Sequence, residues 1–219
     1  MIRRHAVALC FLAALTAGTL FTQALPPVAR EVWIGWVSTN LANLADHPVA
    51  ALVTSAFVPE SDVLSWLAVG AIGLVGLNRA MGNARTLVLV IAVHVIGTLL
   101  SEGLVAVRIL LGQLPDSARY LVDTGPSYVI LGAVVASIAY ASWPARALSA
   151  VAFVLLAPHM FGGLPSLEVS SVGHVVVLVT ALAVGALLPS VNLGGTPGHR
   201  PFRLPARRRG REIVDNPDS

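Results

Sequence analysis

Apolar residues of this 219-residue chain gather in six blocks that are separated by short polar stretches. The blocks cover residues 6–25, 63–77, 86–106, 125–140, 146–160 and 170–188. Each block holds about 15–21 residues, close to the length that an α-helix needs to cross the hydrocarbon core of a bilayer. We therefore predict an all-α, polytopic membrane protein in which six transmembrane helices form one bundle over residues 1–190.

The connection between the first two blocks has a different composition. Residues 27–48 are polar and aromatic and include Trp33 and Trp36, a residue type that favours the membrane–water interface. A short apolar run follows at 49–58 and stops at Pro59. Because this run is too short to span a bilayer, it adds no further span to the prediction.

Composition supports the membrane assignment and limits the chemistry. Hydrophobic residues make up 56% of the chain and charged residues 11%, far from the mixture that soluble domains use. All the basic side chains are Arg, which we interpret as the mark of a GC-rich, bacterial genome. Cys10 is the only cysteine, so the chain has no internal disulfide and no thiolate metal site. We expect no metal and no cofactor.

The distribution of charge predicts the orientation in the membrane. With the amino terminus in the cytoplasm, eleven arginines fall in cytoplasmic segments and three in outer segments, as the positive-inside rule requires. An odd number of spans would break this asymmetry. We therefore predict a multi-pass protein of the plasma membrane with both termini cytoplasmic. The cytoplasmic arginines are Arg3, Arg4, Arg79, Arg85, Arg146, Arg200, Arg203, Arg207, Arg208, Arg209 and Arg211, and the outer ones are Arg30, Arg108 and Arg119.

The two ends of the chain have alternative interpretations. The first block also resembles a cleavable signal peptide, whose removal would leave five spans. The tail at 191–219 is rich in Pro, Gly and Arg, and we predict that it is disordered and cytoplasmic. Its arginines suit contact with anionic lipid, so we expect no nucleic-acid partner.

Two polar residues inside the spans are candidates for catalysis. Ser127 begins the fourth block and His174 lies about one turn into the sixth, so both are expected at one depth near the outer face. A serine hydroxyl becomes a nucleophile when a neutral imidazole accepts its proton, and such a pair suits peptide hydrolysis. The ordinary alternatives are a serine that starts a helix and a buried histidine that is hydrogen-bonded within the core.

Several motifs, together with this pair, resemble those of a known family. They are the segment at 47–57 that enters the second span, the basic turn at 77–85, the sequence Gly125-Pro126-Ser127, and Gly173-His174. In this order the chain resembles the rhomboid intramembrane serine proteases. Residues 38–44 are also similar to a divergent bacterial branch that is described as rhomboid-like. The resemblance implies a six-helix bundle, Ser127 as nucleophile and His174 as base. It further implies substrates that are themselves transmembrane proteins in lipid.

Three positions depart from the rhomboid pattern. Tyr128 replaces the Gly that follows the nucleophile in the family. Asp62 and Trp66 fall where the family has the His and Asn that donate to the oxyanion, and an ionised Asp cannot donate. Val177 and Ala181 replace glycines after the catalytic histidine.

Other groups could compensate for these departures. Backbone N–H groups at the start of the helix, or the amides of Asn40 or Asn43, would be replacement donors to the oxyanion. Asp123 would orient His174, or else is a turn residue, and Tyr128 would hydrogen-bond within the cleft or anchor at the interface.

The sequence thus leaves two functions open: an intramembrane serine endopeptidase, and a catalytically inactive relative that binds transmembrane helices. A transporter or channel is disfavoured because no inverted repeat is evident and the inner halves of the spans carry almost no charge. His94 and Glu102 in the third block would support the pair or form a proton path, or else are ordinary buried residues.

Overall fold

The computed structural model describes residues 2–59 and 62–188, and within these ranges every regular element is helical. The six predicted blocks all form helices, which confirms the all-α bundle. The predicted tail at 191–219 lies outside the described residues. The apolar helices are α1 (Ala6–Ala24), α5 (Val63–Met81), α6 (Asn83–Leu110), α7 (Ser127–Tyr140), α8 (Trp143–Phe161) and α9 (Val169–Leu187).

Helix α7 differs from the other five in length and position. The others have at least 19 residues and are long and apolar enough to cross a membrane. With 14 residues, α7 is only about 21 Å long, shorter than a hydrocarbon core of about 30 Å. Ten of its residues are buried, and it packs against α5, α6, α8 and α9. It is therefore the central helix of the bundle, enclosed by protein instead of lipid.

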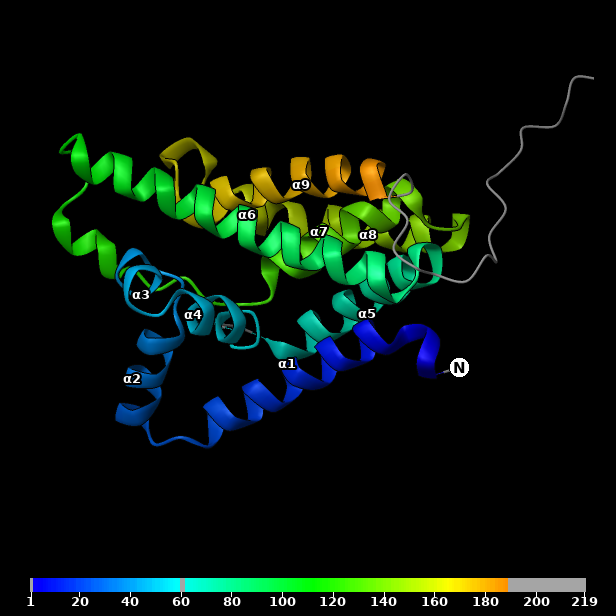
Figure 1. Cartoon of the computed structure of the whole chain (residues 1–219), viewed down its shortest axis with the longest axis horizontal. Helices are drawn as coiled ribbons and strands as arrows, with labels where there is room; N and C mark the ends of the chain where they lie inside the picture. Colours follow the sequence, from blue (N-terminus) through cyan, green and yellow to red (C-terminus); the bar gives the residue numbers. More distant parts are fainter. Residues whose placement is uncertain (1, 60–61, 189–219) are drawn as a thin grey trace, which may run out of the picture.

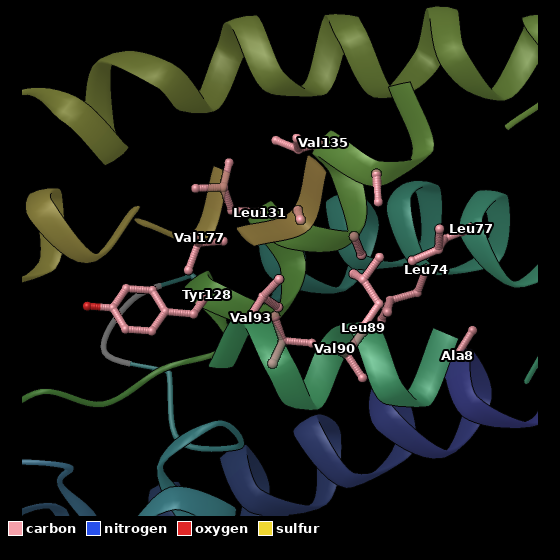
Figure 2. Close-up of a cluster of buried hydrophobic side chains, with 14 of the residues drawn as sticks. Ala8, Leu74, Leu77, Leu89, Val90, Val93, Tyr128, Leu131, Val135 and Val177 are labelled. Carbon is pink, nitrogen blue, oxygen red and sulfur yellow. The ribbon is translucent and has the colours of Figure 1, made fainter. Parts of the chain in front are cut away.

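Side chains from four helices form the apolar core around α7 (Figure 2). Small residues allow the close approach: a Cβ on Gly132 of α7 would lie 2.7 Å from Cγ2 of Val93 on α6. The same core holds Tyr128, whose hydroxyl points away from the apolar cluster in Figure 2. Its other central members include Leu74, Leu77, Leu89, Leu131 and Val177.

Three short helices form the connection between α1 and α5, which the sequence marked only as polar, aromatic and short apolar stretches. They are α2 (Pro27–Val37), α3 (Leu41–Asp46) and α4 (Pro48–Ser55). Proline stands at the first turn of α2 and of α4, where its missing N–H costs nothing. In Figure 1 these helices lie at the end of the bundle opposite the chain's amino terminus, and we call this end the α4 end.

The two tryptophans of α2 lie where an interfacial segment would place them. The ring of Trp36 stacks between those of Trp33 and His47, with centroids 5.7 and 5.0 Å away. The Arg30 guanidinium donates to the carbonyls of Thr22 and Gln23 at 3.0 and 2.8 Å, satisfying the last turn of α1. These hydrogen bonds attach α2 to the end of α1.

Candidate functional site

Ser127 is the first residue of α7 and lies at its α4 end, half-buried. The chain enters this helix through Gly125, whose φ of 124° is open to glycine and to few other residues. The Gly125 N–H donates to the Ser55 carbonyl at the end of α4, at 2.8 Å. No side chain caps α7, so the N–H groups in its first turn, next to Ser127, have no side-chain acceptor.

Ser127 lines a small polar cavity of about 10 Å³ between α4, α6 and the start of α7. This volume is at the lower limit for one water molecule. The histidine that shares the cavity with Ser127 is His94 of α6. The lining residues are Thr39, Ser55, His94, Thr98, Asp123, Thr124, Gly125, Ser127 and Tyr128.

The hydrogen bond of His94 defines its tautomer. Nε2 lies 2.7 Å from the carbonyl oxygen of Leu52 in α4. Because a carbonyl only accepts, Nε2 carries the proton and Nδ1 has the lone pair. Nδ1 has no hydrogen-bond partner, and neither have the hydroxyls of Ser55 and Thr98 in the same cavity. His94 is 8% exposed and Thr98 is fully buried. Three buried polar groups around the cavity therefore retain unused hydrogen-bonding capacity.

The hydrogen bond of His174 is made with the end of α8. Its Nδ1 donates to the Met160 carbonyl at 2.8 Å, and its Nε2 has no partner. Met160 lies in the last turn of α8, where carbonyls lack intrahelical donors. His174 also does not line the cavity that holds Ser127. In this structure His174 joins the end of α8 to α9 and makes no hydrogen bond with Ser127.

Tyr128 packs against both histidines. Its ring centroid lies 5.3 Å from that of His174 and 6.4 Å from that of His94. The hydroxyl donates to Ser101 Oγ on α6 at 3.2 Å. Tyr128 is therefore a buried core residue and does not anchor at the membrane interface, the other role that the sequence left open for it.

Two glycines form the slot in which the Tyr128 ring lies. A Cβ on Gly173 of α9 would collide with the Tyr128 hydroxyl, and one on Gly97 of α6 would lie 3.2 Å from Cδ2 of the ring. The same Cβ on Gly97 would come within 2.7 Å of Val177. In the rhomboid pattern, glycines after the histidine allow the last helix to pack closely. Here Val177 stands at one of those positions, and Gly97 on α6 provides the space for it.

The predicted supporting residues lie at the turn between α2 and α3. Asn40 accepts from the Asn43 N–H at 3.0 Å and caps α3. The Asn43 amide donates to the carbonyls of Gly35 and Ser38 at 2.7 and 2.8 Å. Asn43 thus uses its amide donor within this turn and directs none toward Ser127.

Asp123 connects this turn to the start of α7. Its carbonyl accepts from the Thr39 N–H at 2.9 Å, and its N–H donates to Ser38 Oγ at 2.8 Å. The Asp123 side chain lies 3.4 Å from the Thr39 hydroxyl and lines the Ser127 cavity. Asp123 therefore lines the cavity and holds the turn. The ring nitrogen of His174 that it was expected to orient bonds to the Met160 carbonyl.

The two positions on α5 behave as their chemistry predicts. The Asp62 carboxylate accepts from the Leu64 N–H at 3.0 Å and from the Ser65 hydroxyl at 2.6 Å, so it caps α5 as an acceptor. Trp66 is 8% exposed and packs in a second core cluster.

The Asp62 cap gives a dependence of stability on pH. The hydrogen bonds from Ser65 and Leu64 hold the pKa of the Asp62 carboxyl below its ordinary value. A carboxyl with a lowered folded-state pKa stabilises the fold above its unfolded pKa of about 3.9, and this contribution is lost as pH falls through the folded pKa. We expect Asp62→Asn, which keeps a capping oxygen, to reduce the fall of Tm between about pH 5 and pH 3, measured in detergent. The side chain is fully exposed, so the effect is small, and an unchanged slope would contradict it.

From the sequence, His94 was interpreted as a support for the pair, part of a proton path or an ordinary buried residue, and its place in the Ser127 cavity was missed. The available signal was the spacing of polar residues on α6. His94, Thr98, Ser101 and Glu102 recur at intervals that put them on one helix face, and all four are buried. A polar stripe on an otherwise apolar span indicates a face that packs against protein, because such groups are costly in lipid.

These features together define a polytopic helical membrane protein with a polar site beside a short central helix. The chain matches the rhomboid-like protein family over residues 1–194, and it belongs to that family. No curated protein and no solved structure matches the chain. The family predicted from the motifs is thus confirmed.

Proposed function

We propose that this protein is an intramembrane serine endopeptidase that cleaves transmembrane protein substrates beside the α4 end of the bundle. The observation that supports it is the position of Ser127. Ser127 lines a polar cavity that is also lined by His94, an imidazole with a free lone pair. Polar and ionisable groups inside a membrane bundle are costly, so a cluster of them is a candidate functional site.

The start of α7 would supply the electrostatic part of catalysis. The first-turn N–H groups have no intrahelical acceptor, and the helix dipole adds partial positive charge at this end. An oxyanion that forms on a carbonyl attacked by Ser127 would lie against them. Removing one such donor typically costs about 10²–10³ in turnover, so these backbone groups would have to replace the two missing side-chain donors.

We place the α4 end at the outer face of the plasma membrane, with both termini in the cytoplasm. Among the described residues the acids gather at the α4 end, and five arginines lie at the opposite end of the bundle. Protease protection of tags on the two termini in spheroplasts would test this topology, and digestion of either tag from outside would overturn it. The acids are Glu31, Asp46, Asp62, Glu102, Asp116, Asp123 and Glu168, and the arginines are Arg3, Arg4, Arg79, Arg85 and Arg146.

Cleavage in proteoliposomes tests the peptidase function. A panel of single-span substrates with a helix-breaking residue near the outer boundary is reconstituted with wild-type protein or with Ser127→Ala. We expect cleavage by the wild type and a fall of at least about 10³-fold in Ser127→Ala, because the nucleophile is lost. Ser166→Ala is the matched control: Ser166 is an exposed serine in the short helix before α9 and should leave the rate unchanged.

The second candidate is a non-catalytic protein that binds transmembrane helices. The observation that favours it is that His174 bonds to the Met160 carbonyl and does not line the cavity that holds Ser127. This candidate predicts no cleavage by the wild type. It also predicts that photo-crosslinking to single-span proteins persists in Ser127→Ala and in His174→Ala.

A further inference from the structure

We infer that the aromatic ring of Tyr128 closes His174 off from the Ser127 cavity, and that Ser127 uses His174 as its base only when this ring is displaced. This inference rests on the proposed peptidase function and names the side chain that limits its rate. Three observations support it: the lining of the cavity, the contacts of the ring, and the free nitrogen of His174.

Tyr128 is the residue that the cavity and His174 have in common. Tyr128 lines the cavity together with Ser127, and His174 lines no part of it. The Tyr128 ring nevertheless packs edge-on against the imidazole of His174, with centroids 5.3 Å apart and planes at 86°. We therefore assign the separation of His174 from the cavity to this ring.

Helices α6 and α9 hold the Tyr128 ring in place. The ring runs along α6 from Gly97, where an added Cβ would lie 3.2 Å from Cδ2, to Ser101, whose Oγ accepts from the hydroxyl at 3.2 Å. Thr98, between these two positions, lines the cavity. On α9, a Cβ on Gly173 would collide with the hydroxyl. The ring thus fills the space between α6 at the cavity and the turn of α9 that carries the histidine.

The imidazole of His174 already has the orientation of a base. Its Nδ1 donates to the Met160 carbonyl at 2.8 Å, so Nε2 carries the lone pair, and this buried nitrogen has no partner. A base that is held by a third group and keeps one free nitrogen is the arrangement that activates the serine of hydrolases. His174 therefore lacks access to the cavity and not the means to accept a proton.

The reaction that follows displacement of the ring balances with water as the only co-substrate. The Ser127 oxygen bonds to the substrate carbonyl carbon while its proton passes to Nε2 of His174. The carbon–nitrogen bond breaks, and the leaving amine takes that proton. A water then attacks the acyl ester and gives a proton to Nε2. The carbon–oxygen bond to Ser127 breaks, and the serine oxygen recovers the proton.

Acylation by diethyl pyrocarbonate tests the closed position of His174 without using the peptidase activity. The reagent acylates neutral imidazole, and mass spectrometry gives the rate at each histidine in proteoliposomes. His159 is exposed near the end of α8 and serves as the internal reference. We expect wild-type His174 to react at least about 10²-fold more slowly than His159, because it reacts only when the core opens locally. Tyr128→Ala should remove most of this protection, and similar rates at the two histidines of the wild type would overturn the inference.

Labelling of Ser127 by a fluorophosphonate probe tests the consequence for the nucleophile. We expect Tyr128→Ala to be labelled at least about 10-fold faster than the wild type, since a general base contributes about 10²–10⁴ to a rate. Adding His174→Gln should abolish the gain, because glutamine keeps a donor for the Met160 carbonyl but cannot act as a base. A merely structural role of Tyr128 would not depend on His174 in this way. A gain that survives His174→Gln would overturn the inference.

Phe161 provides the matched control. Its ring also packs edge-on against His174, with centroids 6.3 Å apart and planes at 82°, but it does not line the cavity. Phe161→Ala should therefore leave the labelling of Ser127 close to that of the wild type. Tyr128→Phe keeps the ring and should keep His174 protected from the reagent. Exposure of His174 in Tyr128→Phe would assign the closure to the hydroxyl bond and contradict the role of the ring.

Further measurements separate the possible failures. Size-exclusion profiles and Tm in detergent establish that each variant is folded. If Tyr128→Ala does not fold, Tyr128→Leu replaces it, because leucine keeps apolar volume in the slot without the ring. Exposure of His174 with no labelling of Ser127 in any variant contradicts the peptidase function and not the position of the ring. Equal labelling of an active wild type and Tyr128→Ala contradicts only the inference.

Discussion

Gly173→Val is expected to destabilise the bundle by about 3 kcal/mol or more, seen as a fall in Tm in detergent. A Cβ alone at this position collides with the hydroxyl and with Cζ of Tyr128, and a valine adds two further methyl groups. The ring cannot retreat easily, because Gly97 and its helix border the other side of the slot. Overpacking in a rigid core is relieved only by shifts of side chains and backbone.

The same pair of positions provides the control. Tyr128→Ala empties the slot, so Gly173→Val should cost much less when it is combined with that change. A Cβ added to Gly103 on α6 would meet nothing within 4 Å, and valine favours a helix more than glycine does, so Gly103→Val should leave Tm unchanged or raise it slightly. Equal losses at positions 173 and 103 would show that a valine is unfavourable at either helical site, and that the Tyr128 slot does not determine the effect.

Asn78→Leu is expected to cost about 2–3 kcal/mol, the second large effect on stability. Asn78 is 2% exposed in the last turns of α5. Its Oδ1 accepts from the Ala8 N–H at 3.0 Å, and its Nδ2 donates to Asn83 Oδ1 at 2.7 Å. The substitution leaves the Ala8 N–H without this acceptor and removes the bond to Asn83, so it weakens the contact between the start of α1 and the turn between α5 and α6.

A double-mutant cycle measures this contact directly. Asn78→Ala and Asn83→Ala should each lower the free energy of unfolding, and the double variant should lose less than the sum. The expected coupling is about 0.5–2 kcal/mol, since the two amides share one network. Strict additivity would mean that the bond between the two side chains contributes nothing.

The sequence determined the bundle and its family with little ambiguity. Blocks of apolar residues must form helices in lipid, because only a helix satisfies every backbone group within its own segment. The turn at 77–85 was recognised as a motif, and the structure explains it through Asn78, Asn83 and the positive φ of Gly82. Signals of this kind depend on residues that are close in sequence, so they can be recognised without knowing how the helices pack.

The same reasoning could not show which histidine shares the cavity with Ser127. Rise per residue fixes how deep a side chain lies along its helix, and depth alone suggested His174. Rotation about each helix axis and the offset between helices come from packing. The first residue of the 14-residue α7 lines the same cavity as His94, the twelfth of 28 residues in α6.

His174 illustrates the same limit from the other side. The sequence placed it near the expected depth, but the end of α8 at Met160 offered it a carbonyl without a donor. A buried ring N–H takes such an acceptor because leaving both groups unpaired would cost more than the bond itself returns. The sequence by itself therefore determined six apolar helices, their family and Ser127 at the start of α7. Only the tertiary structure decided which histidine shares a cavity with that serine, since helix ends, rotations and glycine slots are set by contacts between segments far apart in the chain.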